Sequence, residues 1–282
     1  MDNRFCDLHA HSYYSDGTSS PEEILNEAKR IGLSAVALTD HNTVAGVPEF
    51  LRLAKEKDVT AIGGIEFSAV YREKELHVLA LFVREEALDR INELTAEVRR
   101  KKEESNINLV SALSSAGYKI DYDKIKENAK SSINRANIAT ELVGNGYCKD
   151  IATAMTDILA EGKGFYIPPE RLSVFYVLDF IREIGAVSVL AHPFLQFDEQ
   201  GLREFLSVAV PRGLCAMETH YSTYSEETTA LAEKIAEEYK ILQSGGSDFH
   251  ADRKPNISLG YGEGNLFVPF SFYEALKNKI DN

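Results

Sequence analysis

Short apolar segments of strand length alternate with amphipathic segments of helical length over most of this chain, and this alternation restricts the fold more than any other feature of the sequence. The apolar segments cover residues 5–8, 35–38, 60–62, 75–82, 186–190, 214–217 and 241–243. Repeated units of a strand followed by a helix close most readily into a barrel of parallel strands with the helices outside. With 282 residues, 44% of them hydrophobic, the chain is large enough to bury such a barrel. We therefore predict an α/β protein built on a β/α barrel.

Two helices near the start of the chain follow from the residues at their ends. Ser20 precedes Pro21 and two glutamates, which is typical of a capped helix start, and Gly32 is placed to end that helix. A second helix is expected at residues 47–57.

The middle of the chain, residues 85–171, differs from the rest because it is helical and charged and contains no histidine. We predict that it is an inserted, mainly helical subdomain that acts as a lid. The barrel then consists of two parts, residues 1–84 and 172–282.

Side chains that can bind metals lie at or just after the ends of the apolar segments. His9 and His11 are two residues apart after the first segment, so an extended chain directs both to one face. The other positions of this kind are His41, Glu66, His192, Glu218 or His220, Asp248 and His250, while His77 lies inside its segment. Because the carboxyl ends of parallel strands meet at one rim, we expect six of the seven histidines to converge there. The alternative, histidines scattered as ordinary core or surface residues, is disfavoured because residues 85–171 contain none.

The number and type of these side chains indicate a cluster of metal ions. They exceed what one tetrahedral zinc needs and suit two or three divalent ions that share carboxylates. The absence of thiolates from the set is compatible with Mn, Fe or Zn and does not choose among them. A phosphoryl group matches such a cluster because its oxygens bridge the ions while a metal-bound hydroxide attacks in line.

The acidic composition limits the possible partners. Forty-four acidic residues against 31 basic ones give a formal net charge of −13, which disfavours binding to long duplex nucleic acid or to an anionic membrane. The three widely spaced cysteines, Cys6, Cys148 and Cys215, are typical of reduced thiols rather than of a disulfide framework. No signal-peptide pattern precedes the first strand, and no apolar run approaches about 18 residues. We expect a cytoplasmic protein without a membrane partner.

Five motifs in this chain resemble, in order, the successive signatures of the PHP family, named for DNA polymerases and histidinol phosphatases. They are Asp7-Leu8-His9-Ala10-His11-Ser12, Thr39-Asp40-His41-Asn42, Gly64-Ile65-Glu66, Ala191-His192-Pro193 and Gly246-Ser247-Asp248-Phe249-His250. The resemblance implies the PHP fold, a distorted (β/α)7 TIM-like barrel. Within the family the chain is most similar to stand-alone phosphoesterases with a helical insertion. Some of these act on nucleoside 3′,5′-bisphosphates or on the 5′ ends of short RNA.

The resemblance also implies three metal positions. The first is formed by His9, His11, Glu66 and Asp248. Glu66 bridges to the second, which His77 and His192 complete, and the third is formed by Asp16, His41 and His250. Some relatives carry a histidine in place of Asp16. His192, His250 and Asp248 are expected to be catalytic through a metal-bridging hydroxide, and Asp40 is expected to orient an imidazole.

Arg135 and Lys254 are the candidate substrate-binding residues. Arg135 begins the segment Arg135-Ala136-Asn137-Ile138-Ala139, which resembles the Arg-Pro-His-Ile-Ala pattern of relatives whose arginine binds a phosphate. The alternative for Arg135 is an ordinary cation in the first turn of a helix. Lys254, with Arg253, is placed either to hold phosphate or to lie in a solvated loop.

Three further residues keep two interpretations each. Phe165 and Tyr166 are suited to stacking on a base and equally to packing under the insertion. The role of His220 stays open, because relatives carry their histidine one position away.

We expect a phosphatase for small phosphomonoesters, with nucleoside mono- or 3′,5′-bisphosphates or the 5′ ends of short oligonucleotides as first choice. The alternatives are a histidinol-phosphate or sugar-phosphate phosphatase and a non-catalytic metal-binding PHP module. An amidohydrolase-like hydrolase would need a bridging lysine after a mid-barrel strand, and no lysine stands near a suitable strand end. A degenerate module should have lost ligands, whereas competent residues occupy all nine candidate positions.

Overall fold

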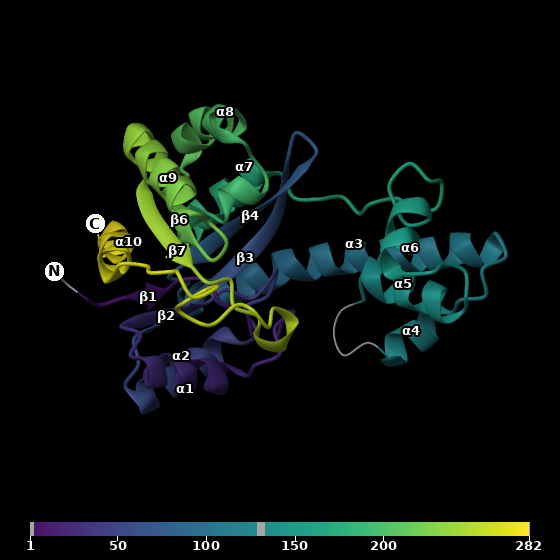
Figure 1. The fold of residues 1–282 in the computed structure, drawn as a ribbon, viewed down its shortest axis with the longest axis horizontal. Helices are drawn as coiled ribbons and strands as arrows, with labels where there is room; N and C mark the ends of the chain where they lie inside the picture. Colours follow the sequence, from purple (N-terminus) through teal and green to yellow (C-terminus); the bar gives the residue numbers. More distant parts are fainter. Residues whose placement is uncertain (1–2, 129–132, 282) are drawn as a thin grey trace. The chain divides into compact units, whose positions relative to one another are not determined.

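The computed structural model describes residues 3–128 and 133–281 and divides the chain into two compact units (Figure 1). One unit is formed by residues 1–92 and 172–282 and the other by residues 93–171. The first boundary falls inside α3 (Leu88–Ser115), the helix with which the chain leaves the first unit. The expected function of the second unit as a lid stays a prediction.

The first unit is built around a sheet of seven strands whose order in space follows the sequence. The strands are β1 (Cys6–Asp7), β2 (Ala35–Leu38), β3 (Ala61–Tyr71), β4 (Lys74–Leu81), β5 (Val187–Leu190), β6 (Ala216–Tyr221) and β7 (Leu242–Gly246). The last strand returns to the first, because the Leu8 N–H donates to the carbonyl oxygen of Gly245 at 3.1 Å. The predicted α/β barrel is therefore confirmed, as a nearly closed sheet of seven strands.

One strand departs from the expected parallel arrangement. β4 runs antiparallel to both β3 and β5. Arg72 and Glu73 have φ of 46° and 69° and form a tight turn that joins β3 directly to β4 without a helix. As a result, the start of β4 lies at the rim where the parallel strands end, and this explains why His77 lies inside its strand rather than after it.

Helices surround the sheet, and the two expected near the start of the chain are present. Ser20 caps α1 (Pro21–Ile31) in a capping box with Glu23, and Gly32 ends it with a left-handed φ of 76°. The other helices of the first unit are α2 (Val47–Lys57), α7 (Val174–Glu183), α8 (Glu199–Ala209), α9 (Glu226–Tyr239) and α10 (Phe270–Asp281). The short 3-10 helices are η1 (Glu85–Ala87), η2 (Pro193–Leu195), η3 (Val210–Arg212) and η4 (Ala251–Arg253).

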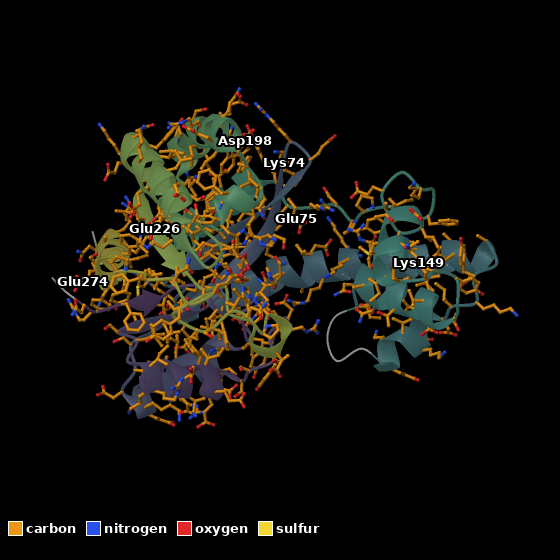
Figure 2. All side chains as sticks on the ribbon, viewed as in Figure 1. Lys74, Glu75, Lys149, Asp198, Glu226 and Glu274 are labelled. Atoms are coloured by element: carbon orange, nitrogen blue, oxygen red, sulfur yellow. The ribbon has the colours of Figure 1, made fainter. Side chains whose placement is uncertain are left out.

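Two apolar clusters stabilise the first unit. One joins strands β1 to β6 to α10 and includes Leu8, Leu79 and Leu276. The other packs α1 and α2 against β2 and includes Leu25 and Phe50. Charged side chains labelled on the outer elements, such as Lys74, Asp198 and Glu226, are exposed (Figure 2).

The second unit contains most of α3 together with α4 (Tyr122–Asn128), α5 (Arg135–Gly144) and α6 (Ile151–Asp157). It has its own apolar core, which includes Leu109, Leu113, Ile138 and Leu142. None of the helices within residues 3–128 and 133–281 is long and apolar enough to cross a membrane.

Candidate metal centre

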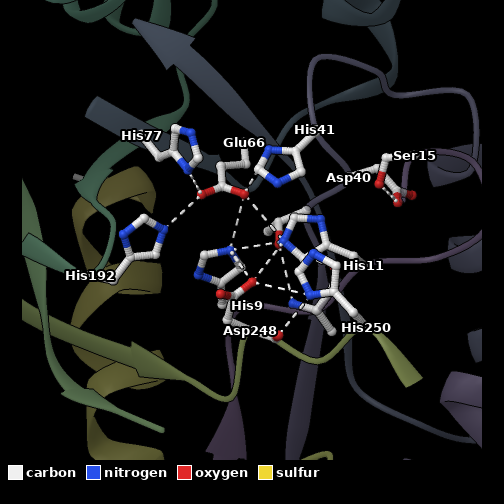
Figure 3. A network of polar contacts seen from close by, with 12 residues as sticks. His9, His11, Ser15, Asp40, His41, Glu66, His77, His192, Asp248 and His250 are labelled. Carbon is white, nitrogen blue, oxygen red and sulfur yellow. Dashed lines mark hydrogen bonds and ion pairs between the residues drawn. The ribbon is translucent and has the colours of Figure 1, made fainter. Parts of the chain in front are cut away.

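The structure brings all nine predicted ligands together in the first unit, at the rim where the parallel strands end. Figure 3 labels all of them except Asp16. They come from segments far apart in the sequence. His9 and His11 follow β1, Asp16 lies in the loop after them, His41 follows β2, Glu66 lies in β3, His77 lies in β4, His192 follows β5, and Asp248 and His250 follow β7. The seventh histidine, His220, is directed away from this group.

Glu66 is the centre of the arrangement, since five imidazoles surround its carboxylate. The Oε2 atom lies 3.3 Å from His9 Nε2, 3.2 Å from His11 Nε2 and 3.0 Å from His41 Nδ1. The Oε1 atom lies 2.8 Å from His77 Nδ1 and 3.2 Å from His192 Nε2. The side chain of Glu66 is fully buried. A buried carboxylate that reaches five imidazoles with two oxygens is suited to bridging cations.

Several of these close contacts are not hydrogen bonds. Among the residues that the structure describes, His11 Nδ1, Glu66 Oε2 and His77 Nδ1 are buried atoms without a hydrogen-bond partner. His77 Nδ1 nevertheless lies 2.8 Å from Glu66 Oε1, so the two atoms are close without the alignment that a hydrogen bond needs. Buried polar atoms are almost always paired, and lone pairs that face a common point suit a shared cation. The donor set therefore fits divalent ions.

The ligand atoms form three groups, and within each group all atoms lie within 4.8 Å of one another. The groups are His9, His11 and Glu66; His41, Glu66 and His77; and His11, Asp16, His41 and His250. Asp248 Oδ1 lies beside the first group, 3.2 Å from His11 Nε2. His41 and His11 each belong to two groups, and His192 and Asp248 belong to none, so the grouping by distance differs in these four residues from the sets that the resemblance implies. The assignment of ligands to ions stays a prediction.

Asp16 is the most exposed member of the nine. Its side chain is 48% exposed, and its Oδ1 lies 3.2 Å from His250 Nε2. Its Oδ2 lies 3.9 Å from His41 Nε2. A carboxylate in this place can complete a cation site with His41 and His250.

Asp248 presents its two oxygens to different neighbours. Oδ1 faces His9 and His11, whereas Oδ2 accepts hydrogen bonds from Tyr221 Oη at 2.8 Å and from Lys254 Nζ at 2.6 Å. This arrangement leaves one oxygen available for a cation. Lys254, predicted as a substrate residue, thus lies at the edge of the centre with its side chain 39% exposed.

The buried imidazoles and carboxylates of the centre shift the pKa values of one another. Burial raises the pKa of Glu66, but His41, His77, His9 and His11 together lower it more, so that it lies well below the usual value. Burial lowers the pKa of His77, yet Glu66 raises it to about 10. For His41, burial dominates and lowers the pKa to about 3. A divalent cation would stabilise the same carboxylates and displace protons from the imidazoles.

Asp40 does not orient an imidazole, and this expectation was wrong. Its Oδ1 accepts the Ser12 N–H at 2.8 Å and the Ser15 hydroxyl at 2.6 Å, and its Oδ2 accepts the Ser12 hydroxyl at 2.7 Å. These hydrogen bonds stabilise the loop between His11 and Asp16 against Asp40, which follows the end of β2.

The question left open for His220 is answered by its contacts. Its Nδ1 lies 2.6 Å from the carbonyl oxygen of Phe267, and its Nε2 lies 2.9 Å from Glu233 Oε1 on α9. It pairs with the outer helix and takes no part in the centre.

Arg135 belongs to the second unit, where it begins α5. Its Nη1 donates to the carbonyl oxygen of Leu159 at 3.2 Å, and its guanidinium lies 4.3 Å from the centroid of the Tyr166 ring. Phe165 packs edge-on against Tyr118. Phe165 and Tyr166 are both partly buried against the apolar core of this unit, which matches the packing interpretation.

Sequence reasoning missed two residues of the centre and left a third undecided. Asp7 and Tyr221 received no role, and Glu218 was named only as an alternative to His220. Glu218 Oε1 lies 2.8 Å from His9 Nδ1. Its place at the end of an apolar strand was the one signal in the sequence for it.

A barrel rim with a buried carboxylate inside a ring of histidines defines a class of metal-dependent hydrolases. Residues 7–162 match the family model of the PHP domain, and the chain belongs to this family.

The chain is also similar to characterised proteins over most of its length. A 5′-3′ exoribonuclease of Haemophilus influenzae is 28% identical over 86% of this chain and 89% of the relative. A phosphoribosyl 1,2-cyclic phosphate 1,2-diphosphodiesterase of Eggerthella lenta is 28% identical over 90% of this chain and 97% of the relative. A solved structure from Bifidobacterium adolescentis, named as a candidate metal-dependent phosphoesterase, has a TM-score of 0.76 and 25% identity and covers 99% of this chain and 97% of that one.

Proposed function

We propose that this chain is a metal-dependent phosphoesterase whose nine rim residues hold two or three divalent ions. The observation that carries the proposal is the ring of five imidazoles around buried Glu66, in which Glu66 Oε2 and His77 Nδ1 lie close to other ligand atoms without a hydrogen bond. Divalent ions at this place supply Lewis acids for phosphoryl oxygens and make water nucleophilic at neutral pH. Mn, Fe and Zn all suit ligands of nitrogen and oxygen.

The protein's own residues divide the remaining work. Asp248 would bind an ion through Oδ1, while Tyr221 and Lys254 donate hydrogen bonds to its Oδ2. Lys254 Nζ is partly exposed and next to a ligand, so it is in a position to donate a hydrogen bond to a phosphoryl oxygen. His192 and His250 each direct one ring nitrogen at a carboxylate of the centre, so their proposed part in catalysis is to hold the ions that would activate the attacking water.

The substrate class follows from the relatives and from the charge of the chain. The names of two relatives refer to RNA and to a phosphoribosyl cyclic phosphate, and both substrates contain phosphorylated ribose. A net charge of −13 disfavours long duplexes and leaves small phosphorylated molecules. We assign nucleoside mono- or 3′,5′-bisphosphates, or the 5′ ends of short oligonucleotides, as substrates. Among the residues of the second unit, Arg135 is the proposed phosphate ligand, because a guanidinium binds phosphate through two parallel hydrogen bonds.

The test is hydrolysis by the Mn-loaded protein over a panel of phosphoesters, followed by inorganic phosphate release for the monoesters and by chromatography of the products for the diesters. The panel contains nucleoside monophosphates, nucleoside 3′,5′-bisphosphates, 5′-phosphorylated short RNA, a ribose cyclic phosphate, sugar phosphates and histidinol phosphate. Turnover is expected for nucleotides and is expected to disappear in Asp248→Ala. Turnover of only sugar phosphates or histidinol phosphate would contradict the substrate assignment and favour the alternative phosphatase.

A non-catalytic metal-binding module is distinguished by chelation. A phosphoesterase that depends on its ions loses turnover when they are removed and regains it when they are returned. A protein that binds ions fully yet hydrolyses no member of the panel would be such a module.

A further inference from the structure

Glu218 lies behind two imidazoles of the metal centre and contacts both residues. It belongs to β6 and its side chain is fully buried. Its Oε1 lies 2.8 Å from His9 Nδ1, and its Oε2 accepts the backbone N–H of His192 at 2.6 Å. One carboxylate therefore joins a residue that follows β1 to a residue that follows β5.

The same two imidazoles meet Glu66 on their other side. His9 Nε2 lies 3.3 Å from Glu66 Oε2, and His192 Nε2 lies 3.2 Å from Glu66 Oε1. The two rings are stacked with their centroids 5.8 Å apart and an angle of 21° between their planes. The His9 ring thus lies between two buried carboxylates, Glu66 at the ligand side and Glu218 behind, whereas Glu218 reaches His192 through the backbone N–H.

The contact with His9 determines which ring nitrogen carries a proton. An ionised carboxylate only accepts hydrogen bonds, so the short contact requires a proton on His9 Nδ1. In the neutral imidazole, a proton on Nδ1 leaves the lone pair on Nε2, and Nε2 is the atom that faces Glu66, His11 and Asp248. A hydrogen bond of this kind fixes the tautomer and the orientation of a metal-binding histidine.

The contact with His192 acts on the backbone instead. His192 has φ of 30° and ψ of 55°, a left-handed conformation that side-chain-bearing residues rarely adopt. The hydrogen bond from its N–H to Glu218 helps to hold this conformation and so fixes the direction of the imidazole. Its ring is left to meet Glu66 through Nε2.

We propose that Glu218 is a shared positioning residue that prepares ligands for two different ions, His9 in the first set and His192 in the second. The proposal rests on the proposed function only in taking these two histidines as metal ligands. It follows that a substitution of Glu218 weakens the binding of two ions together rather than of one.

The variant that tests this is Glu218→Gln, which keeps the size of the side chain and halves its capacity to accept. The amide has one acceptor oxygen and one NH2 donor, so it cannot accept from both His9 Nδ1 and the His192 N–H. The matched control is Glu233→Gln, because Glu233 Oε1 pairs with His220 Nε2 at 2.9 Å outside the centre. The two variants remove the same kind of carboxylate–imidazole contact in different places.

The measurement is calorimetric titration of the metal-free proteins with Zn²⁺, with thermal unfolding as a check of folding. In Glu218→Gln we expect a loss of about 10- to 100-fold in affinity for two ions, and no change in Glu233→Gln. Wild-type affinity for Zn²⁺ in Glu218→Gln, or weaker binding of only one ion, would overturn the proposal. A wild-type protein that binds no Zn²⁺ would instead overturn the proposed function.

A second measurement applies if Glu218→Gln does not fold. Long-range ¹H–¹⁵N spectra of the Zn-loaded wild-type protein report which nitrogen of His9 is protonated. A protonated Nδ1 with Nε2 bound to zinc is the expected result. Zinc bound through Nδ1 would show that Glu218 does not position this ligand.

Discussion

The carboxylate of Asp7 accepts hydrogen bonds from both the backbone N–H and the hydroxyl of Ser247, at 2.9 and 2.5 Å, across the junction between the first and last strands. It also accepts the N–H of His9 at 3.2 Å and that of Gly260 at 2.7 Å. Asp7 is fully buried. It therefore closes the barrel and, at the same time, fixes the chain beside His9 and beside Asp248.

The variant Asp7→Asn should destabilise the protein strongly. Asparagine replaces one of the two acceptor oxygens by an NH2 group, which would face groups that are themselves donors. Each buried group left unpaired costs about 1–3 kcal/mol. We expect the free energy of unfolding in urea to fall by about 3 kcal/mol. The control Ser247→Ala removes one donor and leaves the carboxylate intact, so its loss should be smaller. Equal losses in the two variants would contradict the central role of Asp7.

The variant Gly246→Ala should damage the metal centre through a steric effect. A Cβ at Gly246 would lie 2.4 Å from His9 Cβ and 2.6 Å from His9 N, so the His9 backbone must move. We expect a clear loss of bound metal, measured by mass spectrometry after dialysis. In the control Gly144→Ala the new Cβ meets no atom within 4 Å at the end of α5, so metal content should not change and stability should rise by up to about 1 kcal/mol. Full metal content in Gly246→Ala would mean that His9 is not a ligand.

The variant Lys254→Met tests the proposed contact with phosphate. A charge-assisted hydrogen bond contributes about 1.5–3 kcal/mol, so inhibition by inorganic phosphate should weaken by roughly 10- to 100-fold. The ion content should stay the same, because Tyr221 still holds the outer oxygen of Asp248. The control is Lys234→Met on α9, where the lysine side chain is 68% exposed. Loss of metal with unchanged phosphate affinity would assign Lys254 to Asp248 alone.

The variant Arg135→Lys tests the proposed phosphate ligand of the second unit. Lysine keeps the charge but loses the paired hydrogen bonds of the guanidinium, and it loses the contact with the Tyr166 ring. We expect kcat/KM for nucleotides to fall about tenfold at unchanged metal content. Arg100→Lys on α3, an arginine paired with Glu97 and Glu104, is the control. Unchanged kinetics with lower thermal stability would leave Arg135 a packing role only.

The rim of the barrel could be predicted from the sequence because ligands stand at the ends of apolar segments. His9 and His11 show this, and their side chains are brought together with that of His250 from the far end of the chain. The direction of β4 could not be predicted, since Arg72 and Glu73 do not have the composition of a usual two-residue hairpin turn. The position of His77 inside its segment, rather than at its end, was the sign in the sequence that β4 runs in the opposite direction.

The choice between Glu218 and His220 could not be made from strand periodicity. Residues two apart in a regular strand share a face, so both side chains would have faced the centre. In the structure, the register of β6 against β7 shifts between Glu218 and His220, and the two side chains separate. Asp40 was misjudged for a related reason, because the fold of the loop after His11 decides which groups reach it.

Glu66 is the residue on which the proposed metal centre depends most, and its replacement by glutamine gives the most direct test. Metal content and nucleotide hydrolysis are measured together on wild-type protein and Glu66→Gln after loading with Mn²⁺ under identical conditions. We predict two or three ions per wild-type chain and, in the variant, loss of most of this metal together with the activity. A wild-type protein without bound ions, or a Glu66→Gln protein that keeps both its metal and its turnover, would contradict the account.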